Sequence, residues 1–383
     1  MNGYDAIVLG TGGIGSAALM HLAARGLKVL GIDRFPPGHD RGSSHGQTRM
    51  LRQAYFENPA YVPLVLRSCA LWRDLEQQCG KRLFYEAGLL QIGPAAGEIL
   101  PGVKRSAAVH GLELEELTPM EMTRRFPALP VPGGSAAVFE RRAGFLLVEE
   151  CVVAHAEQAV HLGAELHADE AVISWTAQGG RVQVETDRRR YEADRLLVTA
   201  GAWAGSLLGD LVIPLTVLRK PLYWWAAKSD AYRVERGCPG FLYETPKGIF
   251  YGFPQLDGRG VKLAEHSGGR IVDDPLRVSR ELDAVDQGRV SQFIAKYQPE
   301  LTTTCLDHCV CMYTMSPDAN FIVDRHPEHP QVVFAAGLSG HGFKFAPVLG
   351  EILASLAMGA EPELDIEFLS CRREALKSHE RGS

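Results

Sequence analysis

Hydrophobic and polar positions near the start of the chain predict a strand, a helix and a second strand. Residues 4–9 (YDAIVL) form a mostly apolar run, which is typical of a buried strand. Residues 14–25 repeat apolar side chains every four positions, so they predict a helix with one apolar face. Residues 27–33 (LKVLGID) indicate another strand. The three segments together predict a βαβ unit.

The same patterns continue along the chain. Long helices are predicted at residues 58–79, 149–162 and 345–358, and strands at residues 83–92, 165–175, 181–185 and 195–199. Residues 215–227, 248–253 and 261–266 alternate in the manner of an antiparallel sheet.

These elements predict an α/β fold in which a Rossmann-type nucleotide-binding domain is joined to a second domain built on a mixed, largely antiparallel sheet. A chain of 383 residues exceeds the usual size of one hydrophobic core. We expect a discontinuous nucleotide domain at residues 1–84, 145–212 and 318–383, and a substrate domain at residues 85–144 and 213–317.

Composition narrows the class of protein. The net charge of -6 argues against nucleic-acid binding, which needs a basic face. No apolar run approaches the roughly 20 residues that span a bilayer, so we expect no membrane association and a cytoplasmic protein. Eight cysteines are too sparse for a disulfide scaffold and indicate reduced thiols.

A glycine motif closes the first predicted strand. Gly10, Gly12 and Gly15 follow the G-x-G-x-x-G pattern, in which the glycines allow a tight turn, close approach of a pyrophosphate, and close packing of helix on strand. The helix N-terminus would then favour the anion. Asp33 ends the second strand, where a carboxylate can bind an adenosine ribose. The motif predicts dinucleotide binding but does not choose between NAD and FAD.

Two later segments favour FAD. Residues 196–201 (LLVTAG) predict a buried strand that ends in a turn of small residues, where the backbone can approach the nucleotide again. Residues 332–344 (VVFAAGLSGHGFK) predict a strand, a glycine-rich turn and a helix N-terminus. Backbone N–H groups in such a turn suit the electron-rich edge of a reduced flavin, which a nicotinamide enzyme would not need.

Five short motifs carry a resemblance over nearly the whole chain. They are residues 42–52 (GSSHGQTRMLR), 251–254 (YGFP), 261–263 (VKL), 311–314 (CMYT) and 337–345 (GLSGHGFKF). On these residues the chain resembles the monomeric sarcosine oxidases and N-methyltryptophan oxidases, bacterial flavoenzymes of the D-amino-acid-oxidase superfamily. The resemblance implies a monomeric FAD enzyme that oxidises the C–N bond of a secondary or N-methyl amino acid and passes electrons to O₂ to give H₂O₂.

The resemblance implies that Cys311 holds FAD covalently through its sulfur. Two alternatives are a small buried hydrophobe, the usual fate of a free cysteine, and a metal site built with the nearby Cys305, His308 and Cys309. No second pair of ligands occurs at the spacing that is typical of zinc sites, so we expect no metal.

Two cations are implied to bind the substrate carboxylate. Arg52 and Lys344 supply a guanidinium fork and an ammonium, which suit that anion. A pair of surface charges is the alternative. Arg49 is implied to lie close to the flavin and to stabilise a negatively charged reduced ring.

Lys262 interrupts an apolar strand pattern, so its charge needs an explanation. Burying an unpaired ammonium costs several kcal/mol, and we therefore expect Lys262 to face a polar cavity or water. The resemblance implies that it lies near flavin N5 and promotes reaction with O₂. The alternative is an exposed lysine on an edge strand.

The resemblance extends to further residues. The resemblance implies that His266 lies in the active site and that His45 lies beside the flavin. It implies that Tyr251 is a catalytic residue and also lines the substrate cavity. His326 and His329 are expected to be turn residues. The predicted cofactor site is Gly10, Gly12, Ile14, Gly15, Asp33, Arg34, Ser43, Arg49, Val172, Ala200, Gly201, Trp203, Cys311, Met312, Gly340, Gly342 and Lys344.

Some positions depart from the family pattern or leave the substrate open. Gln47 stands where the sarcosine enzymes carry an acid, and Met315 replaces a polar residue. The aromatic runs at residues 223–225 and 241–243 would shape the far side of the substrate pocket. Sarcosine, a cyclic imino acid and a larger N-methyl amino acid all stay open. An NAD-linked dehydrogenase and a non-catalytic flavin-binding protein are the alternative functions.

Overall fold

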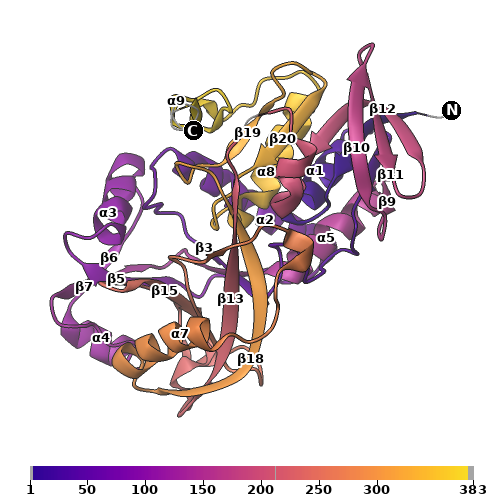
Figure 1. Cartoon of the computed structure of the whole chain (residues 1–383). Helices are drawn as coiled ribbons and strands as arrows, with labels where there is room; N and C mark the ends of the chain where they lie inside the picture. The colour runs from indigo at the N-terminus through magenta and orange to yellow at the C-terminus, as the bar shows by residue number, and fades with distance from the viewer. Residues whose placement is uncertain (1–2, 212, 378–383) are drawn as a thin grey trace.

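The computed structural model describes residues 3–211 and 213–377. Two large β-sheets organise this part of the chain. The first sheet and its helices lie at one end of the molecule, and the second sheet lies at the other (Figure 1). Parts of the predicted domain segments that fall on residues 1–2, 212 and 378–383 lie outside the described residues.

The first sheet has a parallel centre. β12 pairs in parallel with β1 along residues 193–198, and β1 pairs in parallel with β2. The C-terminal half of β12 also pairs with β20, while its N-terminal half pairs with β11. The strands are β1 (Tyr4–Leu9), β2 (Val29–Ile32), β9 (Glu165–His167), β10 (Val172–Gln178), β11 (Arg181–Thr186), β12 (Arg190–Val198), β19 (Ile322–Arg325) and β20 (Val332–Ala336).

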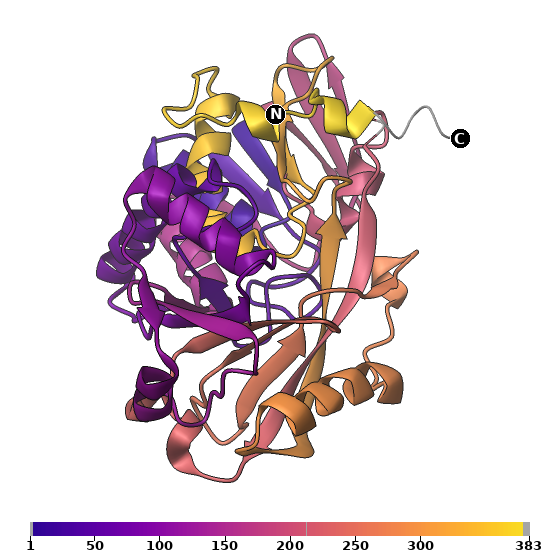
Figure 2. The same ribbon diagram turned by 90° about the vertical axis from the view of Figure 1, so that its left-hand side faces the viewer.

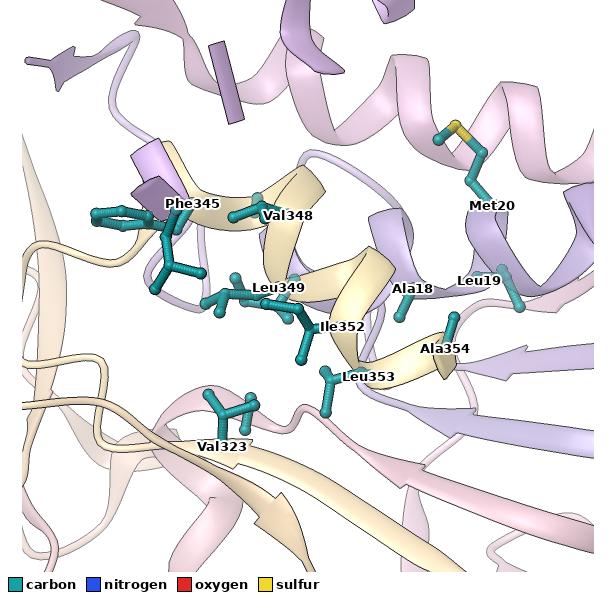
Figure 3. Close-up of a cluster of buried hydrophobic side chains, with 14 of the residues drawn as sticks. Ala18, Leu19, Met20, Val323, Phe345, Val348, Leu349, Ile352, Leu353 and Ala354 are labelled. Carbon is teal, nitrogen blue, oxygen red and sulfur yellow. The ribbon is translucent and has the colours of Figure 1, made fainter. Parts of the chain in front are cut away.

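Four helices pack together beside this sheet. They are α1 (Gly13–Ala24), α2 (Tyr61–Cys79), α5 (Val148–His161) and α8 (Ala346–Ala357). Elements from both ends of the chain therefore lie side by side (Figure 2). In the core, Leu349, Ile352 and Leu353 of α8 lie near Ala18 of α1 and Val323 of β19 (Figure 3).

The second sheet is antiparallel apart from one pair, β14 with β5. Its longest strands, β13 and β18, pair with each other and run toward the first sheet (Figure 1). The strands are β5 (Leu89–Pro94), β6 (Glu115–Leu117), β7 (Ser135–Glu140), β13 (Thr216–Ala227), β14 (Gly240–Thr245), β15 (Gly248–Phe253), β16 (Val261–Glu265), β17 (Arg270–Ile271) and β18 (Leu301–Met315). Its neighbouring helices are α3 (Ile99–His110), α4 (Pro119–Arg125) and α7 (Ala284–Tyr297).

A small third sheet joins β3 (Thr48–Leu51) and β4 (Phe84–Tyr85) to β8 (Gly144–Leu147). Arg49 lies opposite Leu146 in this sheet, and Arg52 follows directly after β3. Short helices include α6 (Ala204–Leu207), α9 (Glu374–Lys377), and the 3₁₀ turns η1 (Gly201–Trp203) and η5 (Phe343–Phe345).

The predicted fold class is confirmed, and most predicted elements appear within a few residues of their expected bounds. Three expectations are wrong in detail. The strand expected at residues 83–92 is two strands, and so is the one expected at 165–175, where Asp169 adopts a positive φ of 57°. Helix α1 is buried on nearly all sides rather than on one face, because α5 and α8 cover it away from the sheet. The domain boundaries stay a prediction.

Within the described residues, no helix is both long enough and apolar enough to cross a membrane.

Gly350 tests the contact between α8 and α1. A Cβ atom there would lie 2.7 Å from backbone atoms of Ala17 and Ala18, so Gly350→Ala should force the helices apart. Overpacking of this kind costs about 1–3 kcal/mol, measured as the free energy of unfolding in urea. Gly205→Ala in α6 is the matched control, because nothing lies within 4 Å of its added Cβ. Equal stability of both variants would contradict the packing described here.

Candidate active site

A cavity of about 300 Å³ lies where the carboxyl ends of β1, β12 and β20 meet residues of the second and third sheets. Parallel strands of an open α/β sheet commonly bind ligands at this edge. The predicted residues that line it are Gly10, Gly12, Ile14, Asp33, Arg34, Ser43, Arg49, Arg52, Val172, Ala200, Gly201, Trp203, Tyr251, His266, Met312, Gly340, Gly342 and Lys344.

The glycine motif shapes one end of the cavity. Gly10 has a positive φ of 86°, and a Cβ on Gly15 would lie 1.8 Å from Gly10 O, so Gly15 allows helix and strand to pack. A Cβ on Gly12 would meet only Ser44 Oγ at 3.7 Å, which leaves the cavity side open. Gly15 thus lies outside the cavity lining, where it allows α1 to pack against β1.

Asp33 lies beside this motif. Its carboxylate accepts hydrogen bonds from Thr11 N at 2.6 Å and from Phe35 N at 3.0 Å. Burial raises the pKa of Asp33, and the nearby His39 lowers it by a smaller amount.

The cavity fits a dinucleotide with an aromatic ring system. The N-cap residue of α1, Gly12, has no side chain to cap the helix, and among the first-turn N–H groups that of Gly13 donates to Ser44 Oγ at 3.1 Å, so the positive end of the helix still favours an anion. Farther along, the buried polar atoms Trp203 Nε1 and Thr314 Oγ1 belong to lining residues and have no hydrogen-bond partner in the described part of the chain. Polar groups of this kind are normally satisfied by a ligand or water.

Cys311 lies just behind the cavity wall, next to the lining residue Met312. Its side chain is 1% exposed, and its sulfur accepts a hydrogen bond from Arg49 Nη2 at 3.2 Å and lies 3.5 Å from Ser43 O. Cys309 comes from the same strand and packs in the same apolar cluster. The sulfur of Cys311 therefore lies beside a guanidinium and against the loop that precedes β3.

Arg52 and Lys344 are buried, so the surface-charge alternative is wrong. Arg52 is 4% exposed and Lys344 is 5% exposed, and both line the cavity. Arg52 Nη2 donates to both oxygens of Glu57, at 2.5 and 2.7 Å, whereas its Nη1 has no partner among the residues that the structure describes. Lys344 Nζ donates to His341 O at 2.6 Å. One guanidinium nitrogen thus stays available to an anion.

Glu57 balances these charges. Burial alone would raise its pKa, but the charge and hydrogen bonds of Arg52 outweigh that effect and lower the pKa of Glu57 to about 2. The carboxylate of Glu57 is therefore ionised at neutral pH. Burial lowers the pKa of Lys344, and the charge of Arg52 adds to this effect. Sequence reasoning missed Glu57, whose one signal is its place five residues after Arg52.

His266 and Tyr251 lie together with Tyr313, which sequence reasoning did not assign to the site. His266 Nδ1 is 3.3 Å from the Tyr313 hydroxyl, and the rings of Tyr251 and His266 meet edge to face at 6.3 Å. Burial, followed by the charge of Lys220, lowers the pKa of His266 to about 3. His266 is therefore neutral at pH 7. Tyr313 could have been found from its place in the C-M-Y-T motif.

Lys262 is placed differently from the expectation. It is 1% exposed, lies outside the cavity lining, and belongs to β16, which is enclosed by β13 and β15. The expected polar cavity or water and the edge-strand alternative are both wrong. Three oxygens replace water: Nζ donates to Gly46 O at 2.6 Å, Thr48 O at 2.7 Å and Thr48 Oγ1 at 3.2 Å. Its ammonium thus supports the turn that leads into β3.

His45 is buried outside the cavity lining, in the loop beside that turn. It is 2% exposed, and its Nε2 has no partner within residues 3–211 and 213–377. Burial and then the Arg49 charge lower the pKa of His45 to about 3. The ring is therefore neutral at pH 7.

His326 and His329 lie far along the first sheet, near Asp210. Their donor atoms and an Asp210 oxygen lie within 4.8 Å of one another, a spacing that could hold a metal ion. However, His326 Nδ1 accepts backbone N–H groups of Glu328 and His329, so the proton of the neutral ring is on Nε2, 3.0 Å from Asp210. His326 and His329 thus lie in a turn that backbone hydrogen bonds to His326 Nδ1 close, in keeping with the expectation.

Comparison with known proteins places these features in a family context. Residues 5–356 match the family described as FAD dependent oxidoreductase. The chain is 40% identical over 376 residues to the monomeric sarcosine oxidase of Streptomyces avermitilis, covering 97% of each protein. It is 38% identical over 372 residues to the N-methyl-L-tryptophan oxidase of Yersinia pestis, covering 97% of this chain and 99% of that protein.

Solved structures share the fold. An unusual amino acid oxidase essential for nikkomycin biosynthesis superposes with a TM-score of 0.84 at 24% identity, over 97% of this chain and 98% of that one. L-proline dehydrogenase from P. horikoshii superposes with a TM-score of 0.83 at 23% identity, over 97% of both chains.

Proposed function

The chain belongs to the family of FAD-dependent oxidoreductases, and we propose that it oxidises the C–N bond of a small secondary or N-methyl amino acid. The observation that carries this proposal is the pair of buried cations, Arg52 and Lys344, in the wall of the cavity that the glycine motif also lines. Buried cations of this kind suit a carboxylate. An NAD-linked dehydrogenase would not explain the family match.

In the proposed reaction an amine gives up the C–H hydride and the N–H proton and becomes an imine, O₂ becomes H₂O₂, and water hydrolyses the imine. When bound, FAD supplies the hydride acceptor and the route of the electrons to O₂. The residues that would hold it are those of the glycine motif, Asp33, the turn at residues 337–342 and Cys311. Arg49 would place a positive charge beside its ring system.

The protein's own residues orient and protect the substrate. Arg52 Nη1 and Lys344 Nζ would hold the carboxylate, which fixes the amine relative to the rest of the cavity. His266 is neutral at pH 7, so it adds no positive charge beside the positive charge that would develop on the substrate as the hydride leaves. Tyr251, Met50 and Phe56 line the same cavity and would exclude water.

We propose that the protein acts as a monomer, in keeping with the names of its sarcosine-oxidising relatives.

Substrate-dependent peroxide release tests the function. Purified holoenzyme should release H₂O₂ with at least one of sarcosine, L-proline and N-methyl-L-tryptophan, because the clamp recognises the carboxylate that all three share. The matched control is N-methylethylamine, a secondary amine without a carboxylate, which should be oxidised far more slowly. Peroxide release from no amino acid in a wider screen would favour the non-catalytic alternative.

We propose that Cys311 forms the covalent bond to FAD. Its sulfur is held by Arg49 and Ser43 next to the cavity lining, which supports the assignment. Acid precipitation of the wild-type protein should therefore leave the yellow colour in the pellet, and Cys311→Ser should release it to the supernatant. Cys309→Ser, two residues away in the same cluster, is the control and should keep the colour in the pellet. Colour that stays in the pellet of Cys311→Ser would exclude this link.

We propose that Lys262 promotes the reaction with O₂ through its buried charge. Lys262→Met should slow reoxidation by O₂ about 10²- to 10³-fold, because preorganised charges stabilise charge that develops in a transition state. Substrate reduction under anaerobic conditions should change much less. Stopped-flow absorbance measures the two halves separately.

Lys220→Met is the control for that experiment. Lys220 is also a buried lysine and donates to three backbone oxygens, those of His266, Ser267 and Gly268. Its replacement should perturb the fold similarly without a selective loss of the O₂ reaction. Wild-type reoxidation in Lys262→Met, or equal slowing in both variants, would refute the role of Lys262.

A further inference from the structure

A chain of hydrogen bonds links the backbone carbonyl of Ala319 to Lys344 through the side chains of His341 and Tyr55. His341 Nε2 is 2.9 Å from Ala319 O, and His341 Nδ1 is 2.5 Å from the Tyr55 hydroxyl. The same hydroxyl oxygen lies 3.5 Å from Lys344 Nζ. Tyr55 is completely buried and His341 is 8% exposed. The residues come from the segment after β3, the turn between β18 and β19, and the glycine-rich turn.

The partners decide where each proton lies. Ala319 O can only accept a hydrogen bond, so Nε2 of His341 carries a proton and donates a hydrogen bond to that oxygen. Burial lowers the pKa of His341 to about 4, so the ring is neutral at pH 7 and its Nδ1 has a free lone pair. The Tyr55 hydroxyl must then donate to Nδ1. A lone pair of the Tyr55 oxygen stays free to accept from Lys344.

Tyr55 also contacts the second cation. Its ring lies 4.1 Å from Cζ of Arg52, within range of a cation–π contact. The backbone carbonyl of Tyr55 accepts a hydrogen bond from the Ser106 hydroxyl, which holds the residue from its other side. One side chain thus contacts both buried cations of the cavity wall.

We propose that Tyr55 and His341 are positioning residues of the carboxylate site: His341 directs the Tyr55 hydroxyl so that its oxygen accepts from the Lys344 ammonium, while the Tyr55 ring supports Arg52. The proposal rests on the proposed function, because it takes Lys344 as a carboxylate-binding cation. It predicts an effect on ligand affinity that comes from one hydroxyl group and depends on the charge of Lys344.

The experiment measures acetate binding to FAD-loaded protein from pH 6 to pH 10. Perturbation of the bound FAD absorbance gives the Kd, so no turnover is required. At pH 7, Tyr55→Phe should raise the Kd about threefold to tenfold, because it removes an acceptor from a charged donor. Anaerobic titration with a substrate of the enzyme should show the same change.

The pH profile separates positioning from general loosening. An oxygen that accepts from the ammonium favours its charged form, so removing that oxygen lowers the pKa of Lys344. Acetate binding should therefore be lost at a lower pH in Tyr55→Phe than in the wild type. The other groups that face Lys344 are Arg52, Glu57 and His341, and they are unchanged in this variant. Loosening of the site alone would raise the Kd equally at every pH.

Two further variants complete the test. Tyr61→Phe is the matched control, because Tyr61 packs against the same His341 and Phe345 rings but its hydroxyl accepts from Phe321 N. It should bind acetate as the wild type does. His341→Ala should shift the pH profile as Tyr55→Phe does, and the double variant should shift it no further, because the two residues act in one chain.

The outcomes distinguish this proposal from the function on which it rests. If Lys344→Met weakens acetate binding but Tyr55→Phe changes neither the Kd nor its pH profile, the positioning role is wrong and the carboxylate clamp stands. An additive double variant would also overturn the linked chain. If Lys344→Met leaves acetate binding unchanged, the clamp itself is wrong, and the positioning role is wrong with it.

Discussion

Burying two positively charged side chains in one cavity wall is the constraint on which the rest of the site depends. Arg52 and Lys344 have lost most of their contact with water, and each unpaired buried charge costs several kcal/mol. One carboxylate, that of Glu57, lies against the pair and makes two hydrogen bonds to Arg52. Arg52 Nη1 has no partner among the described residues, so an anionic ligand is the group that would complete its hydrogen bonds.

The fold brings the parts of this site together from distant segments. Arg52 follows β3 in the small third sheet, and Lys344 lies in η5 between β20 and α8. Ser68 and Trp72 of α2 donate to the backbone carbonyl of Lys344 and so hold η5 in place. The glycine motif and the carboxylate clamp thus lie in the wall of the same cavity, because helices α1 and α2 both pack against α8.

The sequence was sufficient for the fold class and the location of the glycine motif, because both rest on local periodicity and backbone geometry. Tyr4–Leu9 is a strand within its predicted bounds, and the cofactor-site glycines line or support the cavity. Long-range contacts could not be predicted in the same way. Lys262 looked anomalous in its strand because the carbonyls that satisfy it come from residues more than 200 positions away.

Similar reasons explain the partners that were missed. The contact of Tyr55 with His341 joins residues 286 positions apart, and neither residue breaks a local pattern. Glu57 is close to Arg52 in sequence, yet a charged residue before a helix is ordinary, and only its two hydrogen bonds to the buried Arg52 distinguish it. The motifs therefore identified residues at the site, whereas the balance of charge among them required the three-dimensional structure.

A crystal structure of the FAD-loaded protein with bound acetate tests the central claim most directly. The account predicts the acetate carboxylate within hydrogen-bond distance of Arg52 and Lys344, on the side of the cavity away from the glycine motif. An acetate ion bound elsewhere, with Arg52 still bound to Glu57 and Lys344 still bound to His341 and Tyr55, would contradict it.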